Sequence, residues 1–203
     1  MKKIIKLLAF FLIVGVILGS ISVLRDKKAL RESLIRLHVV GNSDSDEDQN
    51  IKLRLKNAVT EYLQPIMDEL PTKEEAMDYI KENINAIQTF SNQFLDSIGE
   101  EDRATVTFDA ESFGKRWYET FSLPSGVYDA LRIEIGKGEG KNWWCVVFPG
   151  LCVPATAENF AETAVAAGFS EGLTNTLTEQ PGYEIRFFLM DCFGRIENIF
   201  YRG

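Results

Sequence analysis

The sequence predicts an α+β domain in which an antiparallel sheet carries helices packed on one face, preceded by an N-terminal signal or anchor helix. Three observations lead to this prediction. The chain begins with a basic and then apolar segment, its middle repeats apolar residues at helical spacing, and its second half alternates apolar and polar residues. No internal repeat or low-complexity tract divides the rest, so we expect one domain over residues 30–203.

The first 22 residues have the layout of a secretory signal. Three lysines precede an unbroken apolar run at residues 7–19, and Ser20 and Ser22 then give the small-x-small pattern of a cleavage site. The apolar run is short for a bilayer span of roughly 20 residues. Residues 1–22 are therefore either a signal peptide cleaved after Ser22 or an uncleaved anchor. In both cases we expect the rest of the chain to be exported, and an uncleaved segment would hold it to the membrane.

The charge of the chain excludes one class of partner. The net charge is −8, and it becomes −11 once the three lysines of residues 1–22 are removed, because that segment contains no acid. Phosphate groups repel such a polyanion, so nucleic acid and anionic membrane surfaces are not expected partners.

The first half of the domain is predicted to form one strand followed by helices. Residues 33–40 (SLIRLHVV) alternate with period two, and an acidic turn follows. A first helix has Pro65 near its end, where it should kink or stop. A second helix opens at Thr72 with Glu75 three residues on, a capping box, and stops at Gly99.

The second half reads mainly as strands. The expected strands cover residues 105–109, 117–123, 131–135, 143–148 and 184–192, with one short helix around 158–167. Trp143–Phe148 is apolar on both faces, which is typical of an interior strand. The stretch 136–142 (GKGEGKN) has too few residues between its glycines for a P-loop, and a strand rather than a helix follows it. We therefore expect a flexible hairpin loop there and no nucleotide site.

Three cysteines bear on the compartment. In an exported domain a disulfide is plausible and one thiol remains over, and Cys145 and Cys152 form the local candidate pair, leaving Cys192. A regular hairpin would set these two sulfurs on a diagonal, too far apart, so the bond requires a looser loop after Phe148. The alternative is two small buried residues.

Candidate metal and catalytic groups are few. Asp44, Asp46 and Asp48 resemble the opening of a calcium loop, but Gln49 replaces its required glycine, and we interpret the pattern as an acidic helix N-terminus instead. His38 is the single histidine of the chain, and no nucleophile motif accompanies it. The sequence therefore predicts no enzyme, no catalytic residue, no metal, no cofactor and no small-molecule substrate.

Two long blocks carry a resemblance to a known family. Residues 34–59 (LIRLHVVGNSDSDEDQNIKLRLKNAV) and residues 118–152 (YETFSLPSGVYDALRIEIGKGEGKNWWCVVFPGLC) are similar to stage II sporulation protein R, a likeness that covers about residues 30–200. Gly41 stands where the family pattern has alanine, and Gly150 where it has a second proline.

The resemblance implies a signalling protein exported from the forespore into the space between the forespore and mother-cell membranes. There it would activate a membrane-embedded aspartic protease of the mother-cell membrane, which removes the pro-sequence of sigma-E. Polar groups beside a strand end and a loop-flanking aromatic pair are our candidates for contact with that partner: His38, Asn42, Asp44, Trp143 and Trp144. An exported cell-wall enzyme or a cell-wall binding module is the alternative function.

Overall fold

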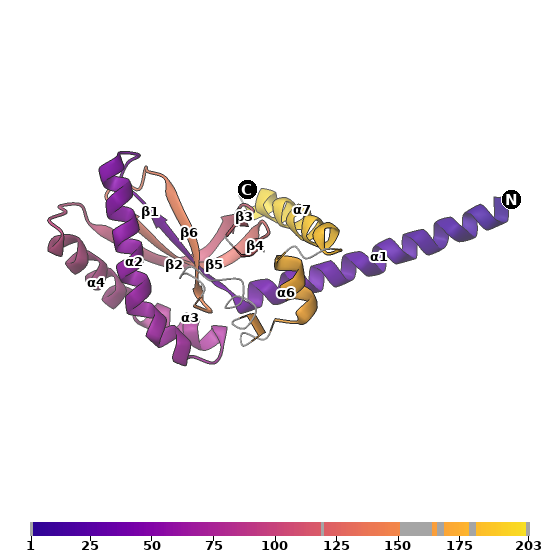
Figure 1. The fold of residues 1–203 in the computed structure, drawn as a ribbon, viewed down its shortest axis with the longest axis horizontal. Coiled ribbons are helices and arrows are strands. Elements are labelled where there is room, and N and C mark those ends of the chain that lie inside the picture. The colour runs from indigo at the N-terminus through magenta and orange to yellow at the C-terminus, as the bar shows by residue number, and fades with distance from the viewer. Residues whose placement is uncertain (1, 119, 151–163, 166–168, 179–181, 202–203) are drawn as a thin grey trace.

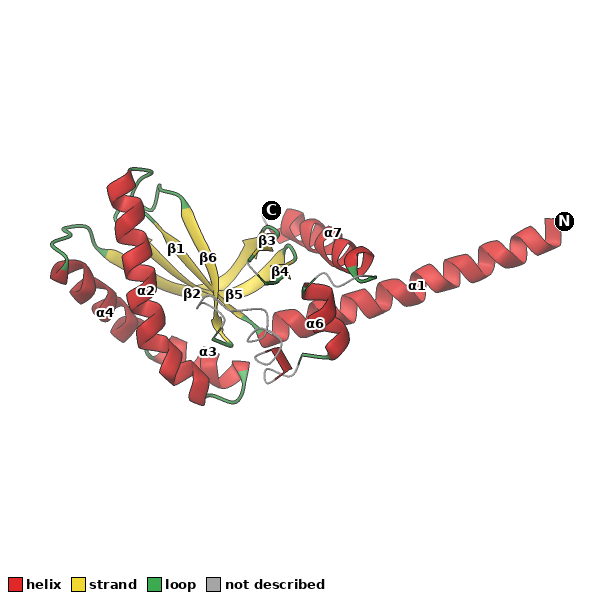
Figure 2. Cartoon of the chain, viewed as in Figure 1, coloured by secondary structure: helices red, strands yellow, loops and turns green. Residues whose placement is uncertain are grey.

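The computed structural model describes residues 2–118, 120–150, 164–165, 169–178 and 182–201 (Figures 1 and 2). Its helices and strands, in chain order, are α1 (Lys2–Ser33), β1 (Ile35–Val40), α2 (Asp46–Glu69), α3 (Lys73–Glu82), α4 (Ile84–Ser97), β2 (Ala104–Phe113), β3 (Arg116–Trp117), β4 (Ser122–Leu123), β5 (Gly126–Ile135), β6 (Asn142–Phe148), α6 (Glu171–Leu177) and α7 (Glu184–Tyr201).

The four-stranded sheet is mixed, which corrects the prediction of an antiparallel one. Its strand order is β2-β5-β1-β6, and β1 runs parallel to β5 but antiparallel to β6. β5 is antiparallel to β2. The parallel pair is possible because the connection between β1 and β5 is long and carries three helices, as a crossover between parallel strands requires.

Helices lie against both faces of the sheet, not on one face as predicted. One face is covered by α2, α3 and α4, and the alternate apolar residues of the strands, among them Leu37, Leu131 and Ile133, pack beneath them in the larger core cluster. On the opposite face α7 lies over β5 together with the end of α1, and a second cluster forms there around Phe113, Tyr128 and others. β5 lies between these two helical layers and is buried along nearly its whole length.

Several local signals form as the sequence predicts. Thr72 caps α3 by accepting a hydrogen bond from the Glu75 N–H at 3.3 Å, and Gly99 adopts a φ of 79° just after α4.

Two helix boundaries differ from the prediction. Pro65 was expected to kink or end its helix, but α2 continues past it to Glu69. The long second helix breaks in two at Asn83, whose side-chain amide donates to the Tyr79 carbonyl oxygen at 2.9 Å. Such a local side-chain bond competes with the helical ladder.

The segment 184–192, predicted as a strand, lies in helix α7. Its buried residues Phe187, Met190, Asp191 and Gly194 follow helical spacing. Gly194 has a packing reason, because a Cβ there would lie 1.5 Å from the Ser125 carbonyl oxygen. The run of aromatic and branched residues favoured a strand locally, and burial along one face of a helix prevailed.

The loop at residues 136–141 is not a hairpin, because β5 and β6 do not pair with each other and β1 lies between them. Gly136 and Gly138 have φ values of 58° and 64°, which side-chain-bearing residues rarely adopt. At Gly140 a Cβ would lie 2.2 Å from the Ser43 carbonyl oxygen, so glycine permits the loop to approach the turn after β1. β6 stands at the end of the strand order, so it is an edge strand of this sheet and not the interior strand expected from its composition.

α1 leaves the body of the molecule, and its N-terminal half projects beyond the other elements (Figure 1). Its C-terminal part joins the fold, since Val23 and Leu30 are buried in the second cluster. In the part of the chain that the structure describes, no helix combines the length and hydropathy of a membrane span. The predicted helix around residues 158–167 lies for the most part outside the described residues.

Candidate functional site

A network of charged and aromatic side chains occupies the sheet face opposite α2–α4. It begins at His38 on β1, which is only 3% exposed. Its Nδ1 lies 2.9 Å from Glu111 Oε2 on β2, and its Nε2 lies 2.7 Å from Asn142 Oδ1 on β6. Its ring stacks on Trp144 with centroids 3.6 Å apart. Arg132 of β5 donates to the same Glu111 carboxylate, so side chains from all four strands of the sheet meet here.

The electrostatics of this network follow from its pairing. Burial alone would raise the pKa of Glu111, but hydrogen bonds and charge from His38 and Arg132 outweigh it and hold that pKa below its ordinary value of 4.5. Burial likewise works against the charged form of Arg132, yet the carboxylates of Glu111 and Glu134 raise its pKa. Arg132 Nη2 donates to Glu134 at 2.5 Å. The ion pairs therefore favour the charged forms of both residues.

The network forms the floor of an open pocket of about 690 Å³. The lining includes Trp144, Arg132 and the glycine-rich loop, and Tyr201 of α7 closes one side. Both ring nitrogens of His38 contact Glu111, Asn142 or Arg132, so the imidazole is held in place. An aromatic surface beside paired charges can bind a polar segment by stacking and by hydrogen bonds.

Arg36 lies next to this pocket and is fully buried. Its guanidinium stands 4.3 Å from the centre of the Phe113 ring, and it donates to the Cys145 carbonyl oxygen at 3.0 Å and the Tyr118 hydroxyl at 2.8 Å. Cation–π contact and these two bonds compensate for part of the cost of burying the charge. Arg36 thus supports β6 from beneath.

Asn42 and Asp44, two of the predicted contact residues, bind the chain's own loop. Asn42 Oδ1 accepts the Lys137 N–H at 3.0 Å, and Asp44 Oδ1 accepts the Lys141 N–H at 2.7 Å. They fix the glycine-rich loop at the rim of the pocket. The acidic residues that follow begin α2, where Ser45 caps the helix, and no metal-binding cluster occurs within the described ranges.

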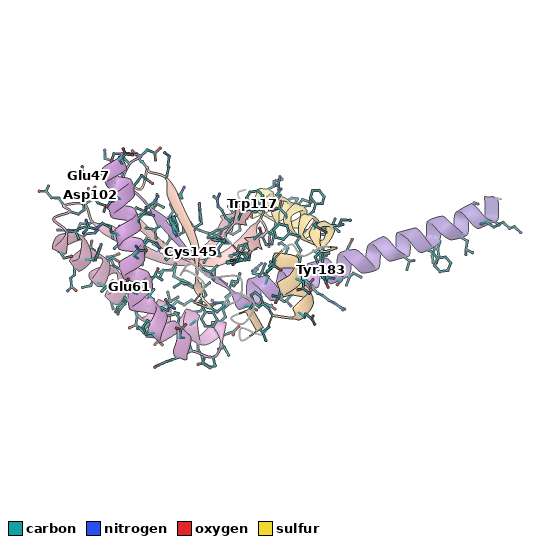
Figure 3. The ribbon with its side chains drawn as sticks, viewed as in Figure 1. Glu47, Glu61, Asp102, Trp117, Cys145 and Tyr183 are labelled. Carbon is teal, nitrogen blue, oxygen red and sulfur yellow. The ribbon has the colours of Figure 1, made fainter. Side chains whose placement is uncertain are left out.

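The two tryptophans do not form one surface, because successive residues of a strand point to opposite faces. Trp144 faces the pocket, whereas Trp143 lies on the α2 side, where the Lys56 ammonium stands 5.0 Å from its ring centre. The structure therefore brings His38 and Trp144 together, places Asn42 and Asp44 behind the rim, and separates Trp143 from them. Trp117, by contrast, is strongly exposed beside α7 (Figure 3).

The predicted disulfide involves one cysteine of β6 and one outside the described residues. Cys145 is buried within β6 in the body of the molecule (Figure 3), and Cys152 lies outside the described residues. The pairing of Cys145 with Cys152 therefore stays a prediction. Among the described cysteines, Cys192 of α7 is a free thiol.

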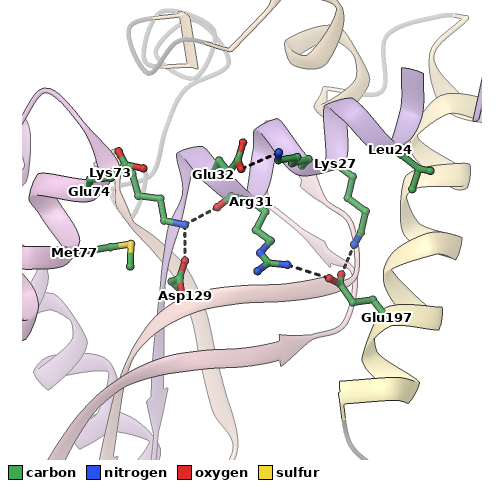
Figure 4. A pocket seen from close by; sticks show the side chains of 10 residues that line it. Leu24, Lys27, Arg31, Glu32, Lys73, Glu74, Met77, Asp129 and Glu197 are labelled. Carbon is green, nitrogen blue, oxygen red and sulfur yellow. Dashed lines mark hydrogen bonds and ion pairs between the residues drawn. The ribbon is translucent and has the colours of Figure 1, made fainter. Parts of the chain in front are cut away.

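A second pocket, of about 500 Å³, marks the junction of α1 with the domain (Figure 4). Lys73 of α3 donates to the Arg31 carbonyl oxygen and to Asp129, both at 2.6 Å. Glu197 of α7 pairs with Lys27 and with Arg31. The main cations of this pocket are paired with acids of the same chain, so it holds the end of α1 in place.

Glu111, Arg132 and Asn142 belong to this network but were not predicted from the sequence. A signal was present, because Arg36, His38 and Arg132 each interrupt an otherwise apolar strand at alternate positions. Their meeting depended on the strand register, in which His38 lies opposite Arg132 on one side and Trp144 on the other.

The fold and the pocket together define a small α+β domain with a charged and aromatic pocket on one face of a mixed sheet. The profile of the stage II sporulation protein R family matches residues 31–158, and the chain belongs to this family. It is 32% identical over 160 residues to stage II sporulation protein R of Bacillus subtilis (strain 168), which covers 75% of this chain and 71% of that protein. No solved structure matches the chain.

Proposed function

We propose that this chain is an exported signalling protein that activates a membrane-embedded aspartic protease and so triggers removal of the pro-sequence of sigma-E in the mother cell. Membership of the sporulation family carries the proposal. The basic and apolar start of the chain supports export, and the acidic remainder argues against a role on nucleic acid. The domain would act between the forespore and mother-cell membranes, released after Ser22 or held by its first segment.

We assign contact with the protease to the His38–Trp144 pocket. Arg132 and Tyr201 are partly exposed at its mouth, and the buried His38 and the half-buried Glu111 hold Arg132 and Trp144 in position. An outward-facing segment of the protease would lie across these groups. In this scheme the chain acts as a ligand and the protease as its receptor. A ligand shifts its receptor toward the active state by binding that state more tightly, so activation requires no catalysis by the chain itself.

Reconstitution tests the activator role directly. The purified chain, the membrane protease and the sigma-factor precursor are combined in proteoliposomes, and removal of the pro-sequence is followed over time. We expect cleavage to depend on the chain and to saturate with its concentration. Equal cleavage without the chain would contradict the proposal, and turnover of isolated cell wall by the chain would support the enzyme alternative instead.

A matched pair of variants tests the contact site. Arg132→Gln removes a cation from the pocket, whereas Arg103→Gln removes one from an exposed ion pair with Asp96 between α4 and β2. At limiting chain concentration we expect Arg132→Gln to lower the cleavage rate about tenfold or more, on the scale of a lost interface contact. Arg103→Gln should match the wild type. Equal rates for both variants, with unchanged melting curves, would remove the pocket as the contact site.

A further inference from the structure

The C-terminal helix α7 has two apolar faces, and one of them has no partner in the described structure. Its inner face, with Phe187 and Met190, packs against the sheet. Its outer face exposes Ile185 (74% exposed), Phe188 (63%), Ile196 (51%) and Ile199 (71%), and Phe200 (81%) and Tyr201 (48%) are also exposed at the end of the helix. A contiguous apolar patch of this kind on a soluble surface marks an interaction site.

The spacing of this outer stripe is symmetric. Going along the helix, the stripe residues are separated by three, four, four and three positions, with the free thiol Cys192 at the centre: Ile185, Phe188, Cys192, Ile196 and Ile199. Steps of three and four are the repeat by which two helices pack along a common seam. When two copies of such a helix run antiparallel about a two-fold axis at Cys192, Ile185 of each faces Ile199 of the other, and Phe188 faces Ile196.

We propose that the chain forms a two-fold dimer through antiparallel α7 helices, with the two Cys192 thiols opposite one another. A two-fold interface must be self-complementary, and this stripe is, position by position. A pocket of about 480 Å³ lined by Trp117, Arg195 and Ile199 borders one end of the stripe and can take the first turn of the partner's helix. The odd cysteine of an exported protein fits the same interface.

A membrane surface is the other occupant to consider for an apolar helix face, and the charges of α7 argue against it. Helices that lie on membranes carry a rim of free lysine or arginine. Here Arg186 is bound to Asp26, Arg195 to Asp191 within α7, and Glu197 to cations of α1. The described part of α7 therefore offers no cationic rim to lipid headgroups, whereas a second copy of the stripe is chemically matched to it.

Disulfide capture on the full-length chain in a mild non-ionic detergent tests the dimer. Diamide accepts two electrons and two protons from a pair of thiols as their sulfur–sulfur bond forms, so opposed Cys192 side chains should be linked within minutes. A Cys192→Ser variant should give no linked dimer. Cys192→Ser combined with Glu69→Cys, an exposed site on α2, is the control for random collision and should also remain monomeric.

The orientation is tested by two further cysteine variants on the Cys192→Ser background. A mixture of Ile185→Cys and Ile199→Cys chains should link, whereas each alone should not, because identical positions in an antiparallel pair lie about 21 Å apart at 1.5 Å per residue. Efficient linkage of each variant with itself would overturn the antiparallel arrangement.

The affinity is tested by Phe188→Asp, which places a charge in the stripe but not in the core. We expect at least a tenfold rise in the dimer dissociation constant by sedimentation, with an unchanged melting curve. An unchanged dissociation constant, or binding of the wild-type chain to anionic vesicles that Phe188→Asp abolishes, would overturn the proposal. None of these measurements depends on protease activation.

Discussion

The two faces of the sheet are built from different chemistry. Beneath α2–α4 the strands contribute mainly apolar side chains, such as Leu37, Leu131 and Ile133, all completely buried. On the opposite face alternate residues of the same strands are Arg36, His38 and Arg132, and each is held by specific hydrogen bonds or ion pairs. The first face supplies stability through burial. The second carries polar groups that fit a binding role and that a core would not need.

The largest expected loss of stability comes from a substitution in the core beneath α2–α4. Leu131→Ala removes buried methyl groups at the centre of the sheet, and we expect the free energy of unfolding to fall by about 2–5 kcal/mol, because the cavity relaxes only in part. Leu53→Ala on the outer surface of α2 should change it by less than about 0.5 kcal/mol. Urea denaturation followed by tryptophan fluorescence measures both, and equal losses would contradict this division.

A smaller effect is expected at the rim of the polar face. Gly140→Ala places a Cβ against the Ser43 backbone, which side-chain motion cannot relieve, and should cost about 1–3 kcal/mol. Gly41→Ala is the matched control, since the closest contact of its Cβ is the end of the Gln49 side chain, at 2.9 Å, and the nearest backbone oxygen lies at 3.4 Å. Thermal melts of the two variants should differ clearly. A near-identical pair would mean that the loop is not held as closely as the structure shows.

The ion pairs of the polar face should also make the stability of the domain depend on pH. The pKa of Glu111 is lower in the folded state than its ordinary value of 4.5, so its ion pairs stabilise the fold above that pH, and the contribution is lost as pH falls below it. The free energy of unfolding of the wild type should therefore decline more steeply below pH 4.5 than that of Glu111→Gln. Parallel curves for the two proteins between pH 5 and pH 3 would exclude this contribution.

The smallest effect concerns the tryptophan on the apolar side. Lys56→Ala removes the cation over Trp143, a partly exposed contact worth about 0.5–1 kcal/mol. We expect a small loss of stability and no change in sigma-factor processing, because Trp143 faces away from the pocket. A processing defect equal to that of Arg132→Gln would show that the contact surface extends to the α2 side.

The sequence by itself determined several of the local elements and the family. Helical spacing, the Thr72 cap and the alternation of Ile35–Val40 are local properties, so they could be predicted from neighbouring residues alone. The absence of a nucleotide motif at residues 136–142 was equally local.

Only the tertiary structure decided the parallel pairing of β1 with β5, the helical state of α7 and the composition of the pocket. Each depends on residues far apart in the chain. Glu111 and His38 meet because β2 and β1 both pair with β5, which sets their register. α7 is a helix because its apolar residues are buried along one helical face against the sheet. The physical reason is that strand order and register are fixed by which faces are buried together, and a shift of one residue would reverse every side chain.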